Sequence, residues 1–219
     1  MSMDQTQDIK EPGSTKLALS VAFAGLISGL AIISIYEATL PTITANKAEE
    51  LRRAVFRVLP GVDKMQLLEY SDDKLIVNPD ADRKAEIVYG GYDKQGQLVG
   101  YAIPHAGPGF QDTISVLYGY QPSRRKVVGM WILDSRETPG LGDKIYKDAE
   151  FVANFDDLSA DPEIKTMKKG TKSAPNEIDA ITGATISAKA VARIINEAHA
   201  VWKDRFPPPG NEPKLGGAE

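Results

Sequence analysis

The chain has 219 residues, 42% of them hydrophobic, so its length suits one globular domain with a sizeable core plus an appendage. With 26 basic and 30 acidic residues its formal net charge is -4, which excludes the basic surface typical of nucleic-acid-binding proteins. The absence of cysteine excludes disulfides, thiolate nucleophiles, cysteine-ligated iron–sulfur clusters and a lipoprotein anchor. The two histidines, His105 and His199, are too few for a histidine-rich metal site, and no metal is expected.

The first predicted element is a membrane-spanning helix at residues 17–36, which follows a leader at residues 1–16. The run "LALSVAFAGLISGLAIISIY" is uncharged and has about the 20 residues that a helix needs to cross a bilayer. A cleaved signal peptide is the alternative, but the run is long for one, the leader contains several acids, and no A-x-A cleavage pair follows. We therefore predict an uncleaved single span, whose orientation the flanking positive charges do not decide.

Small residues line one face of this span. Ala18, Ala22, Gly25 and Gly29 follow one another at helical spacing, and the last two form a GxxxG pair. Small side chains let a second transmembrane helix approach closely, so the stripe predicts helix packing within the membrane. Chance is the alternative, because glycine and alanine are common in spans.

The pattern after the span predicts one α+β domain at residues 37–206, in which helices pack on an antiparallel sheet. A short linker at residues 37–44 precedes an amphipathic helix that ends at Pro60 and Gly61. Four strand-like runs, separated by turn residues, predict a four-stranded antiparallel meander at residues 82–134.

The C-terminal part of the chain predicts a second amphipathic helix at about residues 187–205. Its apolar face comprises Ile186, Ala190, Val191, Ile194, Ile195, Ala198, Val201 and Trp202. Residues 207–219 are rich in proline and glycine and lack core-forming residues, so we expect them to be disordered.

The start of this helix is the first candidate site, and it reads "DAITGATIS" at residues 179–187. A helix N-terminus presents free backbone N–H groups and the positive end of the helix dipole, which together favour a phosphate. Gly183 and Ala184 leave room for a ligand to approach, and hydroxyls come from Thr182, Thr185 and Ser187, the last also a candidate N-cap. On these residues alone, an ordinary capped helix after a glycine turn remains the alternative.

The second candidate site is the loop "SRETPGLGDKI" at residues 135–145, directly after the last strand of the meander. Its proline and two glycines predict a tight turn with exposed backbone, and the leucine at its tip is suited to pack on a flat ring. The candidate contacts with such a ring are Glu137, Thr138, Gly140, Leu141 and Gly142. Taken alone, the loop also fits an ordinary hairpin exit.

The two motifs together resemble those of FMN-binding domains that carry a covalent flavin. The pattern D-x-x-[ST]-G-A-T-x-[ST] of these domains is matched at Asp179, Thr182, Gly183, Ala184, Thr185 and Ser187. "ETPGLG" resembles their second signature, the loop that contacts the isoalloxazine. With the span in front, the chain resembles G subunits of Rnf complexes, which are ion-translocating ferredoxin:NAD oxidoreductases, over the span and about residues 45–206.

The resemblance implies an FMN held through a phosphoester to Thr185, transferred from FAD by a separate flavin transferase. The motif residues around Thr185 would then shape the cofactor site. It further implies an electron carrier between the iron–sulfur and flavin centres of other Rnf subunits, with no catalytic acid or nucleophile of its own in turnover. The protein would lie in a bacterial inner membrane, with residues 1–16 cytoplasmic and residues 37–206 periplasmic.

Three alternatives stay open. The chain could be the equivalent flavin-bearing C subunit of a sodium-translocating NADH:quinone oxidoreductase, which the brevity of the chain and the "GDKI" continuation disfavour. It could be an anchored assembly module of the same fold without a flavin, although the intact "TGAT" argues against this. A stand-alone reductase would need a second nucleotide-binding signature, and no G-x-G-x-x-G is present.

Overall fold

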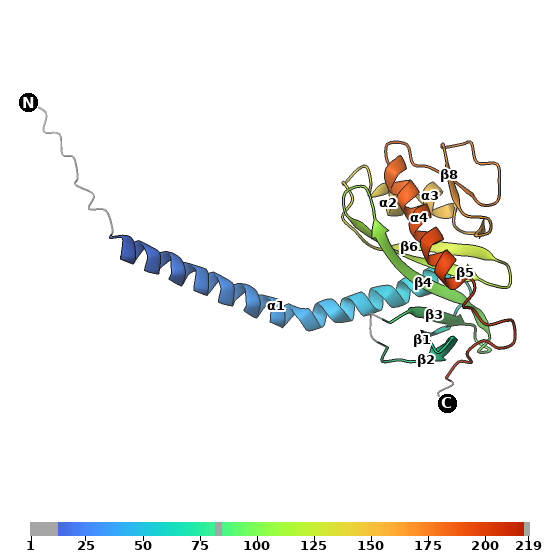
Figure 1. Ribbon diagram of the computed structural model, residues 1–219, viewed down its shortest axis with the longest axis horizontal. Helices are drawn as coiled ribbons and strands as arrows, with labels where there is room; N and C mark the ends of the chain where they lie inside the picture. The colour runs from blue at the N-terminus through green and yellow to red at the C-terminus, as the bar shows by residue number, and fades with distance from the viewer. Residues whose placement is uncertain (1–12, 82–84, 217–219) are drawn as a thin grey trace, which may run out of the picture. The chain divides into compact units, whose positions relative to one another are not determined.

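A computed structural model describes residues 13–81 and 85–216 of the chain (Figure 1). The chain divides into two compact units, Met1–Ala48 and Glu49–Glu219. The described part of the first unit is helical, and the second unit contains the sheet and the remaining helices.

Helix α1 (Ser14–Val58) contains the predicted span and continues through the residues predicted as a linker. Its apolar part is long enough to cross a membrane. Pro41 lies inside the helix and removes one backbone hydrogen bond, while the turns on either side stay bonded. The hydroxyls of Thr39 and Thr44 donate to carbonyls one turn earlier, at Ile35 (2.8 Å) and Leu40 (2.9 Å). The prediction of a linker at residues 37–44 was therefore wrong, because a single proline does not end this helix.

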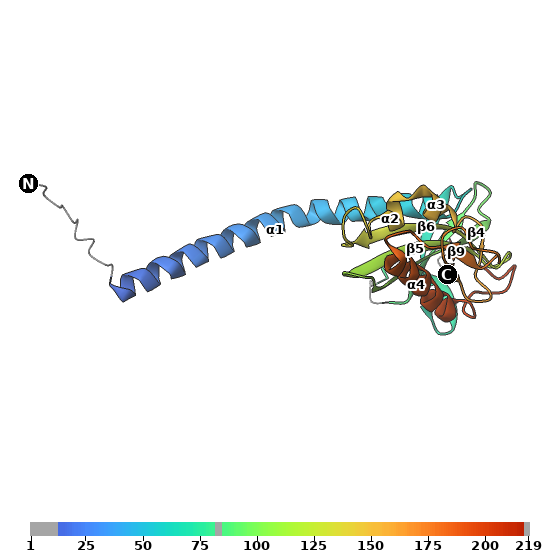
Figure 2. The same cartoon turned by 90° about the horizontal axis from the view of Figure 1, so that it is seen from above.

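The second unit is built on a seven-stranded antiparallel sheet in the order β2-β1-β3-β4-β5-β6-β7 (Figures 1 and 2). Its strands are β1 (Lys64–Ser71), β2 (Lys74–Val77), β3 (Ile87–Tyr92), β4 (Leu98–Pro108), β5 (Thr113–Gln121), β6 (Lys126–Ser135) and β7 (Leu158–Ser159). Strands β8 (Lys165–Met167) and β9 (Glu177–Asp179) pair in parallel as a separate sheet. The helices of this unit after α1 are α2 (Lys144–Lys147), α3 (Ala149–Ala153) and α4 (Thr185–Trp202).

The predicted meander is confirmed as strands β3 to β6, each paired with the next. The first residue of that prediction, Asp82, lies outside the described residues. The β1–β2 hairpin was not predicted. Its signal was the pair Asp72 and Asp73 between two apolar runs, because both residues have positive φ, +50° and +59°, as a two-residue hairpin loop requires.

The sheet is covered on both faces, and each face has its own apolar cluster. Helix α4 packs on one face through Val191, Ile194 and Trp202 in the larger cluster, and Figure 2 shows it lying across the strands. The last turns of α1 cover the other face, where Val55 and Val58 join a smaller cluster. The α+β class, with helices on an antiparallel sheet, is confirmed.

The residues after α4 lie against the strands at one end of the sheet. Phe206 stacks on Tyr101 with 4.4 Å between ring centroids. Further along, the hydroxyl of Tyr92 donates to the Pro213 carbonyl (2.7 Å), and the Gly216 N–H donates to Gln66 (3.0 Å). The prediction of a disordered tail did not anticipate these contacts, which a run of proline and glycine does not signal.

Candidate functional site

Both sequence motifs fold into a β-turn with glycine in the third place. In the first turn the Leu141 N–H donates to the Thr138 carbonyl (3.2 Å), and Gly140 has a φ of +78°. In the second, the Ala184 N–H donates to the Ile181 carbonyl (3.0 Å), and Gly183 has a φ of +83°. A positive φ in the third place is the pattern of a type II turn, which only glycine adopts without strain.

The two turns meet at the N-terminus of α4. A Cβ atom built on Gly183 would lie 3.8 Å from Leu141 Cδ2, an ordinary van der Waals distance. One built on Gly142 would lie 2.7 Å from Glu137 Oε2 and 3.1 Å from Ser187 Oγ, closer than a side chain tolerates. The structure therefore brings the two motifs, far apart in the sequence, into direct contact.

Glu137 is the residue that holds this arrangement together. It is buried, with 5% of its surface exposed. Oε1 accepts hydrogen bonds from the backbone N–H groups of Phe110 (2.9 Å) and Gln111 (2.8 Å), and the Asp112 N–H lies at 3.5 Å. Oε2 accepts a hydrogen bond from the hydroxyl of Ser187. One carboxylate thus links the β4–β5 loop, the "ETPGLG" loop and α4.

These donors also control the charge of Glu137. Burial on its own raises the pKa of this carboxyl, but the hydrogen bonds from Ser187 and the three backbone N–H groups outweigh burial and lower the pKa below its usual value. Glu137 is therefore an ionised internal acceptor. The prediction that it offers an acceptor to a ring edge stays a prediction, and in the structure protein donors already contact both of its oxygens.

Ser187 likewise has a different role from the one predicted. Helix α4 begins at Thr185, its N-cap position is Ala184, and no side chain caps it. Ser187 lies inside the first turn and is buried, and its hydroxyl points to Glu137. The prediction of Ser187 as the N-cap was wrong by three positions, because the helix starts before the serine.

Thr185 is exposed at the first position of α4. Its hydroxyl has one weak contact, to the carbonyl of Ile181 at 3.4 Å. Within the described residues, the backbone N–H groups of Thr185, Ile186 and Ser187 have no acceptor. Thr182 and Gly183 before it are exposed too, and a Cβ on Gly183 would meet nothing closer than Leu141. The threonine hydroxyl is therefore open to a bulky partner, beside three free donors suited to a phosphate.

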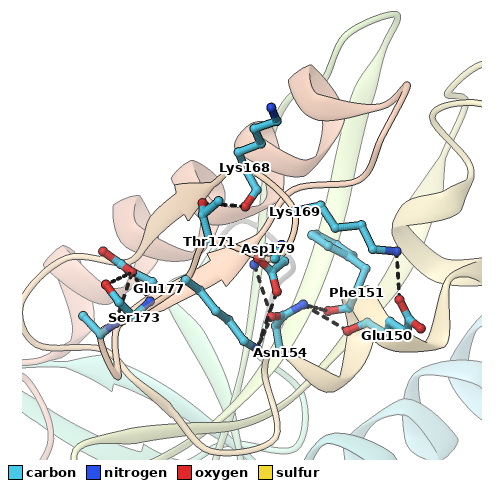
Figure 3. Close-up of polar contacts among 12 residues, drawn as sticks. Glu150, Phe151, Asn154, Lys168, Lys169, Thr171, Ser173, Glu177 and Asp179 are labelled. Atoms are coloured by element: carbon cyan, nitrogen blue, oxygen red, sulfur yellow. Dashed lines mark hydrogen bonds and ion pairs between the residues drawn. The ribbon is translucent and has the colours of Figure 1, made fainter.

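Asp179 supports the segment that leads into the second turn (Figure 3). Its Oδ1 accepts from the Gly170 N–H (2.8 Å), and its own N–H donates to Asn154 Oδ1 (3.2 Å). Asn154 is the C-cap of α3, and its Oδ1 also accepts from Lys172 Nζ (2.7 Å). Asp179 therefore fixes the approach to Thr185 through internal contacts. The polar side chain of Thr138, in the other loop, donates to Gln111 Oε1 at 2.7 Å.

Three large apolar side chains are exposed on the segments that meet here. Leu141, on the first turn, is 50% exposed; Ile186, next to Thr185, is 57% exposed; Phe110, in the loop bound by Glu137, is 64% exposed. The sequence predicted Leu141 as a contact with a ring and Ile186 as part of the apolar face of the helix, and it gave no prediction for Phe110. An aromatic residue at a Gly-Pro-Gly turn was the available signal, since such a turn does not bury it.

The two histidines and Trp131 lie outside both motifs. His105 is in β4, paired with Val116. His199 is buried in α4 against the ring of Tyr120. Trp131 packs with the cluster beneath α1, and the Arg57 guanidinium lies 4.3 Å from its ring centroid.

The FMN-binding domain family matches residues 109–200, which begin in the β4–β5 loop and include both motifs. Among solved structures, NqrC of Shewanella oneidensis has the same fold, with a TM-score of 0.61, 19% identity, and 74% of this chain and 98% of that chain covered.

Curated relatives match over nearly their whole length. The G subunit of the Na(+)-translocating ferredoxin:NAD(+) oxidoreductase complex of Acetobacterium woodii is 31% identical, over 86% of this chain and 91% of its own. The G subunit of the proton-translocating ferredoxin:NAD(+) oxidoreductase complex of Clostridium ljungdahlii is 33% identical, over 78% of this chain and 82% of its own. The G subunit of the ion-translocating oxidoreductase complex of Methanosarcina acetivorans is 27% identical, over 84% of this chain and 92% of its own.

Proposed function

The chain belongs to the family of G subunits of ion-translocating oxidoreductase (Rnf) complexes, and from this premise we propose that it is a membrane-anchored electron carrier with FMN bound covalently to Thr185. The observation that carries the proposal is the exposed hydroxyl of Thr185 at a helix N-terminus, next to a glycine without a side chain. A phosphoester at this hydroxyl would meet the three free N–H groups of the first turn of α4.

The attachment is a transfer of FMN from FAD by a separate flavin transferase. The Thr185 oxygen forms a bond to the phosphorus that bears the ribityl chain, the pyrophosphate bond of FAD breaks, and AMP leaves. The hydroxyl proton passes to a base of the transferase, because no carboxylate or histidine among the described residues contacts Thr185 Oγ1.

The chain's own part is to hold and orient the cofactor, which supplies the redox chemistry when bound. The exposed side chains of Phe110, Leu141 and Ile186 offer apolar surface to a flavin ring, and the Glu137–Ser187 link keeps their segments together. A covalent bond keeps the cofactor on the domain where free FMN is absent. Neighbouring iron–sulfur and flavin subunits of the complex would exchange electrons with it.

The membrane arrangement is part of the proposal. Helix α1 is long and apolar enough for one span, and its relatives are G subunits of ion-translocating complexes. We place the anchor in the bacterial inner membrane, the leader in the cytoplasm and the flavin domain in the periplasm. Curated relatives above 30% identity are G subunits, which favours this family over the C subunit of the sodium-translocating NADH:quinone oxidoreductase.

Replacement of the acceptor tests the proposal. Thr185→Ala removes the hydroxyl, so the full-length protein purified from cells with a flavin transferase is expected to lose the added mass of FMN less water. Thr185→Ser keeps a hydroxyl and is expected to retain the adduct. Since Thr185 is exposed, neither change should alter the free energy of unfolding by more than about 0.5 kcal/mol.

Two outcomes would contradict this function. A covalent flavin that persists in Thr185→Ala would mean that another residue carries it. An unmodified wild-type protein, purified from cells in which the transferase modifies other substrates, would favour the assembly module without a flavin.

A further inference from the structure

A groove of about 700 Å³ runs along α4 in the second unit. One wall is α4 and the other is β8 with the residues before it. Pro108 at the end of β4 and Gly109 after it also line the groove. Ile186 and Lys189 lie in the α4 wall. Since Lys189 is one helical turn after Thr185, it shares a helix face with the acceptor hydroxyl, and Ile186, the residue next to Thr185, also lines the groove.

The β8 wall has a free strand edge. Strand β8 pairs with β9 in parallel, and the ladder uses the backbone groups of Lys165 and Met167. In such a ladder the groups of the intervening residue, Thr166, point to the opposite side. Thr166 lines the groove, and within the described residues its N–H and carbonyl have no partner.

The adjacent position on the same edge shows what this edge accepts. The side-chain amide of Asn196 in α4 accepts from the Ile164 N–H (2.9 Å) and donates to the Ile164 carbonyl (2.9 Å). It therefore imitates the backbone of a paired strand. An extended peptide that enters the groove would continue this pairing at Thr166, which is the β-augmentation mode of peptide recognition.

The charge of the groove selects the kind of peptide. Its lining contains Lys165, Lys189 and Arg193 against one acid, Glu163. The charge of this lining is therefore opposite in sign to that of the whole chain, whose formal net charge is -4. Arg193 already pairs with Glu197 (3.0 Å). Lys165 and Lys189 are exposed, and neither has a carboxylate within ion-pair distance among the described residues, so both can meet carboxylates of a partner.

We propose that this groove binds an extended acidic segment of the flavin transferase and so places that enzyme at Thr185. The inference rests on the proposed function. The groove reaches Ile186, the residue after the acceptor, and no base among the described residues contacts the acceptor hydroxyl. The transferase must therefore bring its catalytic groups to Thr185, and contacts in the neighbouring groove would hold it there. A neighbouring redox protein of the complex has no such need to contact the residues around the hydroxyl.

Steady-state flavin transfer tests the docking step. The full-length protein in detergent, freed of flavin by expression without a transferase, is mixed with purified transferase and FAD, and transfer is followed by in-gel fluorescence and intact mass. The variant Lys165→Glu/Lys189→Glu reverses two groove charges, and Lys94→Glu, in the exposed β3–β4 turn, is the matched surface control. Thermal unfolding checks that each variant is folded.

We expect the double variant to raise the KM for the acceptor protein about fivefold or more with little change in kcat, and Lys94→Glu to leave both unchanged. Added salt should raise the KM of the wild type and affect the double variant less. Equal KM values for wild type and double variant would overturn the proposal, and so would a defect confined to electron transfer in the assembled complex or to the flavin spectrum. If the wild type accepted no flavin at all, the proposed function itself would fail, which is a separate result.

Discussion

Glu137 shows how one residue can serve a site without touching the ligand. Its carboxylate is buried among four donors, three from the β4–β5 loop and one from α4. Hydrogen bonds to a charged acceptor contribute more than neutral ones, and a donor left unpaired in the interior is costly. The two signature loops therefore depend on this side chain for their relative position.

Glu137→Gln tests this role. The amide keeps the shape but loses the charge, so we expect the free energy of unfolding to fall by about 1–3 kcal/mol at neutral pH, measured by urea denaturation. Because the hydrogen bonds lower the pKa of Glu137 in the folded state, its contribution is complete above the unfolded value, about 4.3, and is lost as pH falls through the folded pKa. The difference between wild type and variant should therefore shrink in acid.

A matched control exists on the surface. Glu150 is exposed and pairs with Lys169, so Glu150→Gln should change stability by less than about 1 kcal/mol. Wild-type stability in Glu137→Gln at neutral pH would show that the carboxylate is not what joins the loops.

At the scale of elements, two glycines determine how closely the end of α1 approaches the sheet. Gly119 in β5 and Gly129 in β6 face each other across the strands. A Cβ on Gly119 would lie 1.9 Å from the carbonyl oxygen of Val58, and one on Gly129 would lie 2.7 Å from it. The helix therefore packs with its backbone against the strands, and no side chain fits between them.

Gly119→Ala is expected to be strongly destabilising for this reason. The added methyl group would clash with backbone, which cannot move aside as a flexible side chain does, and we expect a loss of about 3 kcal/mol or more in unfolding free energy. Ser115→Ala in the same strand removes a half-buried side chain without a clash and serves as the control. A Gly119→Ala protein that unfolds with the wild-type midpoint would contradict the packing of α1 on this face.

At the scale of the whole molecule, the chain belongs to a family that works in membrane complexes. The small-residue stripe in the span remains a prediction, because a Cβ on Gly25 or Gly29 would meet nothing within 4 Å in the described chain. We propose that a helix supplied by another member of the complex packs against this stripe.

Gly25→Leu/Gly29→Leu tests that contact. Two bulky side chains would keep a partner helix from close approach, so we expect a several-fold loss of the other subunits that co-purify with the tagged chain from membranes. Ala31→Leu, on the opposite face of the same helix, should leave recovery unchanged. Equal recovery of the other subunits with the wild type, the double variant and Ala31→Leu would show that the stripe is not part of an interface.

The sequence by itself determined the features that depend on neighbouring residues. The uncharged run of the span, the alternation of strands β3 to β6, the apolar face of α4 and the two glycine turns are all local patterns, and the structure contains each of them. Two predictions from local patterns were wrong. The segment around Pro41 was predicted as a linker but is part of α1, and Ser187 was predicted as the N-cap but lies inside α4.

Only the tertiary structure decided how these pieces are joined. Glu137 binds Phe110, 27 residues away, and Ser187, 50 residues away, and no periodicity relates such positions. The exposure of Phe110 and Ile186 and the groove between α4 and β8 likewise arise from segments that meet only after folding. The physical reason is that hydrogen bonds and packing depend on distance in space, whereas a sequence pattern reports only what lies within a few residues along the chain.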